Sequence, residues 1–259
     1  IIIAGSGPTN RNGNQMGMQN NSLKYLAEAI AKDGNVAFSF DKRIIAQMKA
    51  GNLDEKSLRF DDLINDVKDI ITYFKSQKKY NKIIIAGHSE GSLIGMIAGK
   101  DNVDAYISIA GAGRSADLII AEQIEKQAPF LKKETDENLK LLKEGKTFEL
   151  KNQMLASIFR ESVQPYMISW IKYNPQEEIK KLSIPILIIN GTKDIQVPES
   201  DAKLLHEANP ISELKIIDKM NHVLKEINED AENIKSYSNP DLPIMEELSI
   251  TIDSFIKSL

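Results

Sequence analysis

The chain has 259 residues, a formal net charge of −4 at pH 7 and no cysteine. The lack of cysteine excludes a disulfide framework and a thiolate metal site, and three scattered histidines argue against a histidine metal site. Charges of both signs are mixed along the chain, so no nucleic-acid partner is expected, and no apolar run reaches the about 18 residues of a membrane span.

The pattern of apolar residues predicts an α/β fold. Strand-like apolar runs alternate with helical patterns, which indicates a mostly parallel sheet with helices on both faces. The predicted strands cover residues 1–4, 36–40, 82–86, 104–109, 184–190 and 214–217. The predicted helices cover residues 21–32, 60–78, 90–99, 199–208 and 244–258. A chain of this length fits one large domain of this class.

A glycine-rich loop follows the first predicted strand, from Gly5 to Gly13. A loop of this kind leaves backbone N–H groups without a partner, and these groups can bind an anion. The loop lacks the Lys-Ser/Thr ending of a phosphate-binding P-loop, so nucleotide binding is not predicted. A flexible surface loop is the alternative interpretation.

The most specific motif is Gly87-His88-Ser89-Glu90-Gly91, which has the form G-x-S-x-G. It follows a buried strand and precedes a buried helix, and a nucleophile elbow requires this context. On such a turn the hydroxyl of Ser89 stands above the sheet edge, while the flanking glycines avoid clashes with the neighbouring strand and helix. The simpler interpretation is a glycine-rich turn with an incidental serine.

The connection between the predicted strands 104–109 and 184–190 spans about seventy residues, which is too long for an ordinary loop. We expect an inserted helical lid there, with a solvated turn at residues 132–137. The expected parts of the chain are a core segment at 1–114, a lid at 115–175 and a second core segment at 176–259.

Two later loops offer an acid and a base. Asp194 lies in the loop after the predicted strand 184–190, and His222 follows the last predicted strand. Serine is a weak nucleophile until a base removes its proton. Histidine titrates in the right range to be that base, and a carboxylate fixes its tautomer and stabilises the imidazolium. The sequence therefore predicts a triad of Ser89, Asp194 and His222.

Other residues of the same types fit these roles less well. His88, inside the elbow, is expected to pack or to hydrogen-bond locally, and His206 falls in a polar helix as a solvated residue. Asp218 is the main rival to Asp194. It lies close before His222 in the sequence and is interpreted as a surface residue at a strand end.

The chain resembles the α/β-hydrolase superfamily, and more narrowly its bacterial serine-aminopeptidase-like and esterase-like members. The order Ser, Asp, His is the order of that superfamily. The other similar segments are Ile3–Asn14, Phe40–Arg43, Gly191–Pro198, Met220–Lys225, Asn239–Pro243 and Ile252–Ile256. The resemblance implies an α/β-hydrolase fold with two strands before the first predicted one, so we expect the first strands to be missing from this chain.

Three positions depart from the pattern of this group. Asn10 and Asn12 stand where the group often has aspartate, and Ile44 stands where it has glycine. None of these positions belongs to the predicted triad, but they leave the substrate channel undefined.

The resemblance also implies an oxyanion hole. Ala4-Gly5 stands in place of the usual His-Gly, and by position the backbone N–H groups of Ser6 and Glu90 would hold the oxyanion. The N–H of Glu90 begins a helix, whose positive dipole end favours an anion. The side chain of Glu90 either orders the elbow or caps that helix, and the cap is the preferred interpretation.

The predicted activity is that of a serine hydrolase that cleaves a small-molecule carboxylic ester through an acyl-enzyme, without a cofactor or metal. The candidates for the acyl pocket are Phe159, Tyr166, Met167 and Trp170, although packing of the lid explains any one of them. An amidase or aminopeptidase is the alternative on the same triad. The candidates for binding a substrate ammonium are Glu122, Glu125 and Glu161. An acyltransferase and a non-catalytic binding protein also stay open, as do the oligomeric state and the compartment.

Overall fold

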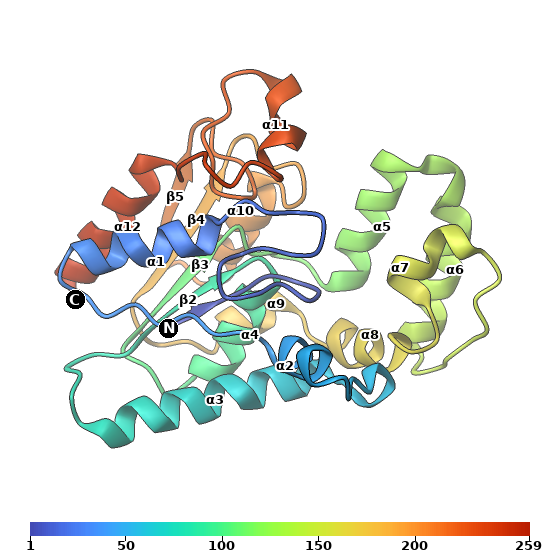
Figure 1. Ribbon diagram of the computed structural model, residues 1–259, viewed down its shortest axis with the longest axis horizontal. Coiled ribbons are helices and arrows are strands. Elements are labelled where there is room, and N and C mark those ends of the chain that lie inside the picture. The colour runs from blue at the N-terminus through green and yellow to red at the C-terminus, as the bar shows by residue number, and fades with distance from the viewer.

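Five parallel strands form the centre of the protein, in the order β1-β2-β3-β4-β5. The computed structural model describes residues 1–259, and Figure 1 shows helices on both sides of the sheet. The strands are β1 (Ile2–Ile3), β2 (Ile84–His88), β3 (Ala105–Ile109), β4 (Ile186–Gly191) and β5 (Glu213–Ile217). Strands β2 to β4 are rich in isoleucine and almost wholly buried, which is typical of parallel strands covered on both faces. The predicted α/β class is confirmed.

Alternate residues of the strands enter two separate apolar cores, one on each face of the sheet. Ile3 and Ile85 belong to one core, and Ile2 and Ala86 belong to the other. The helices of the first core are α3 (Phe60–Gln77), α4 (Glu90–Gly99), α9 (Pro175–Ile179) and α10 (Glu199–Ala208). The helices of the second core are α1 (Ser22–Lys32) and α12 (Glu246–Ser258), which lie side by side in Figure 1.

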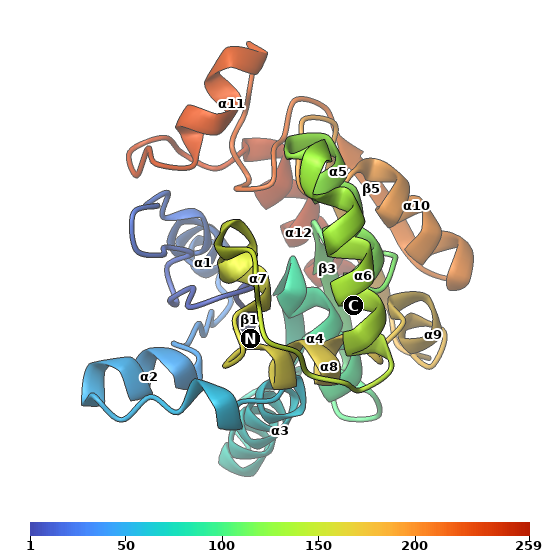
Figure 2. The same ribbon diagram turned by 90° about the vertical axis from the view of Figure 1, so that its right-hand side faces the viewer.

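A helical segment joins β3 to β4 and has an apolar core of its own. Its helices before α9 are α5 (Ala116–Gln127), α6 (Lys132–Lys143), α7 (Ala156–Phe159) and α8 (Gln164–Ile171). Nine buried residues, Leu139 and Phe159 among them, form this third core. Figure 2 shows α5 to α8 in front of the sheet when the molecule is viewed from the right-hand side of Figure 1.

The solvated turn that was predicted at 132–137 is wrong, because these residues open α6 and Thr135 is fully buried. Lysine and glutamate are good helix formers, and Lys132 pairs with Asp136 one turn later at 2.9 Å. A run of charges therefore formed a helix instead of interrupting one.

The predicted strand at 36–40 is also wrong, since only one bridge forms there, between Ile2 and Ser39. Two short helices were not predicted, α2 (Arg43–Ala50) and α11 (Asp230–Ser236). Helix α2 has no buried residue and is only eight residues long, so its apolar pattern is short. No helix of the protein is both long and apolar enough to cross a membrane.

Candidate active site

The turn between β2 and α4 holds Ser89 in a strained backbone conformation, with φ of 55° and ψ of −122°. A non-glycine residue at positive φ costs free energy and persists only where its surroundings enforce it. Here the surroundings are very close. A Cβ on Gly87 would lie 2.3 Å from the carbonyl oxygen of Gly91, and one on Gly91 would lie 2.4 Å from that of Ile3. Both glycines are therefore required by the turn.

Ser89, His222 and Asp194 form a hydrogen-bonded row at the carboxyl edge of the sheet. The Nε2 atom of His222 is 3.1 Å from the Oγ of Ser89, and its Nδ1 atom is 2.8 Å from Oδ2 of Asp194. The three residues follow β2, β5 and β4, whose carboxyl ends meet at one edge because the strands are parallel. The side chains of His222 and Asp194 are 5% and 0% exposed, so solvent does not compete for their contact.

The carboxylate of Asp194 is fixed by more than the histidine. Its Oδ1 atom accepts hydrogen bonds from the backbone N–H groups of Gln196 and Val197, each at 2.8 Å. These bonds leave Oδ2 directed at His222. Asp218, the rival acid, is exposed and accepts a hydrogen bond from Thr192 instead.

His206 also lies elsewhere, since its Nδ1 atom is 2.9 Å from the hydroxyl of Ser212. It is not among the residues near Ser89 and takes no part in the row. Of the three histidines, His222 alone contacts the Oγ of Ser89.

His88 holds the backbone of His222 in place, a role that was not predicted from the sequence. Its Nε2–H donates to the backbone carbonyl of His222 at 2.8 Å, and the two rings lie 4.9 Å apart. Burial, with a smaller contribution from the neighbouring His222, lowers the pKa of His88 to about 4. His88 is therefore neutral near pH 7 and acts as a hydrogen-bond donor that fixes the His222 backbone.

His88→Gln is expected to make the protein more resistant to acid. The unfolded chain protonates this imidazole near its ordinary pKa of 6.5, and the folded chain does so only near 4. Between these values the unfolded state binds more protons, so stability falls as the pH falls, by a total on the order of 3 kcal/mol. Glutamine keeps an N–H donor but does not titrate.

The measurement is the urea midpoint of the parent and of His88→Gln at pH 7 and at pH 4.5. The midpoint of the parent should fall further than that of the variant. An equal fall in both proteins would show that His88 is not the group responsible.

Two backbone N–H groups of the cavity that Ser89 lines have no hydrogen-bond partner. Neither the N–H of Ser6 nor that of Glu90 donates to another group of the protein, and both residues line the same cavity as Ser89. Gly5 brings the loop close, because a Cβ at that position would lie 3.2 Å from the Cβ of Ser89. The arrangement offers two donors to an anion beside the serine.

We expected the side chain of Glu90 to cap its helix, but the side chain points into a buried cluster instead. It accepts a hydrogen bond from the hydroxyl of Tyr166 at 2.7 Å, and its other oxygen lies 3.3 Å from the ammonium of Lys42. Lys42 also donates to the carbonyl of Gly5. This buried cluster was not predicted, because its members come from distant parts of the chain.

A cavity of about 620 Å³ opens at Ser89 and extends under the segment between β3 and β4. Of the predicted pocket residues, Tyr166, Met167 and Trp170 line it. Phe159 does not, since it is buried in the third core. Trp170 stacks on Phe60 with ring centroids 5.9 Å apart, so it packs the segment onto the body as well.

The candidate acids for a substrate ammonium lie outside this cavity. Glu122 pairs with Arg114 and Lys126, Glu161 accepts the backbone N–H of Leu150, and Glu125 lies on the surface. The acids that do line the cavity are both engaged, Glu90 with Lys42 and Glu55 with Arg160.

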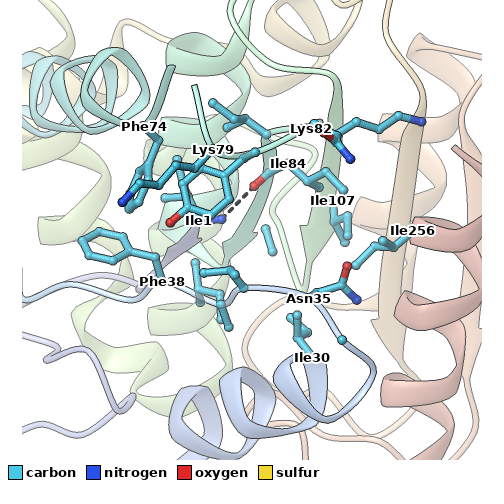
Figure 3. Close-up of a pocket in the computed structure, with 18 residues that line it drawn as sticks. Ile1, Ile30, Asn35, Phe38, Phe74, Lys79, Lys82, Ile84, Ile107 and Ile256 are labelled. Carbon is cyan, nitrogen blue, oxygen red and sulfur yellow. Dashed lines mark hydrogen bonds between the residues drawn. The ribbon is translucent and has the colours of Figure 1, made fainter. Parts of the chain in front are cut away.

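A second cavity, of about 490 Å³, lies at the opposite, amino-terminal end of the strands (Figure 3). Its walls are mostly apolar and include Ile1, Phe38, Phe74 and Ile256. None of the residues of the triad lines it. No cluster of three or more histidines and acids in the protein is placed to hold a metal ion.

Known proteins share this sequence pattern and this fold. The profile of the BD-FAE family matches residues 1–208 of the chain. Esterase EstD of Thermotoga maritima is 24% identical over 230 residues, a match that covers 86% of the chain and 54% of EstD. The chain thus spans about half the length of this curated relative.

Solved structures of low sequence identity have the same fold. Est1E from Butyrivibrio proteoclasticus superposes with a TM-score of 0.60 at 15% identity, covering 99% of this chain and 86% of Est1E. A thermophilic esterase from Thermogutta terrifontis gives a TM-score of 0.56 at 15% identity, covering 99% of this chain and 89% of that protein. Together with the matched profile, these likenesses show that the chain belongs to the BD-FAE family and has the α/β-hydrolase fold.

Proposed function

We propose that the protein is a serine hydrolase that cleaves a carboxylic ester through an acyl-enzyme. The observation that carries this proposal is the row from Ser89 through His222 to Asp194, with contacts of 3.1 and 2.8 Å, beside a cavity that Ser89 lines. A buried carboxylate behind the histidine and a strained serine in front of it are the parts that an activated nucleophile needs.

The first half of the proposed reaction acylates the serine. His222 takes the proton of Ser89 as the Oγ attacks the substrate carbonyl, and Asp194 stabilises the imidazolium that forms. The N–H groups of Ser6 and Glu90 hold the oxyanion of the tetrahedral intermediate. His222 then gives its proton to the leaving alcohol, and the acyl group stays on Ser89.

The second half of the reaction releases the acid. His222 removes a proton from water, the hydroxide attacks the acyl-enzyme, and the same two N–H groups hold the second oxyanion. The acid leaves as His222 returns the proton to Ser89. No other group is required for either half.

The cavity supports a preference for esters over aminoacyl substrates. Both acids in its walls are already paired with a base, so a substrate ammonium would find no free carboxylate there. Tyr166, Met167 and Trp170 supply an apolar wall for the acyl group. We propose that the segment 115–175 that carries them is the lid of the active site. EstD is named an esterase, and this name supports the same activity. Est1E shares the fold.

The protein is expected to hydrolyse nitrophenyl esters with an initial burst of nitrophenol. Its rate of hydrolysis of aminoacyl nitroanilides is expected to be far lower. The burst reports acyl-enzyme formation before slow deacylation. Stopped-flow absorbance with both substrate classes at equal concentration measures both expectations. Faster turnover of the anilide would replace the esterase proposal with an aminopeptidase on the same triad. An acceptor alcohol that diverts the acyl group from water would identify an acyltransferase.

A further inference from the structure

Beside the triad, a buried cluster of three side chains has no part in the proposed reaction. Lys42 and Glu90 form an ion pair with 4% and 1% of their side chains exposed, and Tyr166 donates to the same carboxylate. An ion pair that is removed from water this completely is a poor way to stabilise a fold, because the desolvation of both charges offsets their attraction. Its position therefore points to another role.

The contact of Lys42 with Gly5 determines the direction of a catalytic donor. The carbonyl of Gly5 and the N–H of Ser6 belong to one peptide group, which is planar and trans, so the two bonds point in opposite directions. Lys42 holds the carbonyl on one side. The N–H of Ser6 is thereby turned to the other side, toward the cavity, and the ammonium polarises the peptide group so that this N–H becomes a stronger donor.

The other member of the ion pair carries the second donor. Glu90 contributes its backbone N–H to the oxyanion hole, and its side chain holds Lys42 in place. One ion pair thus connects the two loops that supply the two donors. These loops are far apart in the sequence, and no backbone hydrogen bond joins Ser6 directly to Glu90.

Tyr166 connects this arrangement to the segment over the cavity. It lies in α8 and its hydroxyl donates to Glu90. Burial raises the pKa of Tyr166 well above its ordinary value, and the charge of Glu90 raises it further, so the hydroxyl keeps its proton. We infer that Lys42, Glu90 and Tyr166 are positioning residues that align the two oxyanion donors and attach them to α8. This inference rests on the proposed function.

The test uses the double variant Lys42→Met/Glu90→Gln, which removes both charges together and leaves no unpaired charge in the interior. Both backbone donors remain, but the peptide group of Gly5 and Ser6 loses its anchor. We expect kcat for a nitrophenyl ester to fall by about 10²-fold, as when one oxyanion donor is lost, with KM within about threefold of the parent.

A second readout separates positioning from general damage. Ser89 adds to a trifluoromethyl ketone to form a C–O bond, the carbonyl electron pair moves to the oxygen, and His222 takes the serine proton. The affinity for this ketone should fall by the same factor as kcat/KM, while the affinity for the corresponding alcohol, which forms no oxyanion, should not change. A fall in both affinities, or in neither, would overturn the inference.

Tyr166→Phe provides an independent test, with Tyr173→Phe as its matched control. Tyr173 likewise donates its hydroxyl to a carboxylate, that of Asp61 at 2.6 Å, and contacts Phe60, but it does not line the cavity. We expect kcat to fall several-fold in Tyr166→Phe and to stay within about 1.5-fold of the parent in Tyr173→Phe. Equal values in the two variants would contradict the inference. A parent protein without ester turnover would overturn the proposed function as well, whereas an active parent with unaffected variants would overturn the inference alone.

Discussion

Ser89→Ala is expected to lower kcat for ester hydrolysis by about 10⁴- to 10⁶-fold, the largest effect of any single replacement in the protein. Alanine removes the Oγ that lies 3.1 Å from His222 and leaves the rest of the site in place. The oxyanion donors and the cavity remain, so a small residual rate above that of water should persist.

The replacement should not unfold the protein, because alanine keeps the same Cβ in the same strained turn. Thermal melting of both proteins checks this point, and initial rates with a nitrophenyl ester give kcat. A variant that kept more than about one hundredth of the parent rate would mean that Ser89 is not the nucleophile.

Asp194→Asn is expected to lower kcat by about 10⁴-fold while the site keeps its shape. The backbone N–H groups of Gln196 and Val197 need an acceptor, so the amide oxygen of the new side chain should face them. Its NH₂ group must then face Nδ1 of His222 and donate to it. This contact selects the tautomer with a proton on Nε2, which cannot accept the proton of Ser89.

Asp218→Asn is the matched control for this replacement. Asp218 is exposed and contacts Thr192, so its replacement should leave kcat within about twofold of the parent. Rates for the two variants with one ester decide between the two acids. A large loss in Asp218→Asn, with Asp194→Asn active, would exchange their assignments.

The row of Ser89, His222 and Asp194 could be predicted because its signals are local. A glycine-flanked serine between a buried strand and a buried helix indicates a turn, and parallel strands bring their carboxyl ends to one edge. Asp194 and His222 follow two such strands, so the sheet itself places them near Ser89. Apolar runs likewise predicted β2, β3 and β4, whose residues are almost wholly buried.

The supporting contacts could not be predicted, because they depend on packing between distant segments. The bond from His88 to the carbonyl of His222 spans 134 residues, and the Lys42–Glu90 pair spans 48. In the sequence Glu90 is simply an acid in the first turn of a helix, which favours the capping interpretation. Only the fold brings Lys42 and Tyr166 to the two carboxylate oxygens of Glu90.

The two predicted elements that were wrong have other causes. The residues at 36–40 have the apolar pattern of a strand, but a strand also needs a continuous partner, and only Ser39 forms a bridge. The charged residues at 132–137 resemble a turn, yet their helix propensity and the burial of Thr135 favour a helix. A missing strand partner thus decided the first case, and helix propensity together with burial decided the second.

The most direct test of the central claim is labelling with a fluorophosphonate probe, followed by intact-mass measurement, on the parent and on Ser89→Ala. The probe forms a stable bond only with a serine whose hydroxyl is activated. We expect one adduct on the parent and none on the variant. A folded parent that takes up no adduct, or a variant that is labelled as fully as the parent, would contradict the central claim.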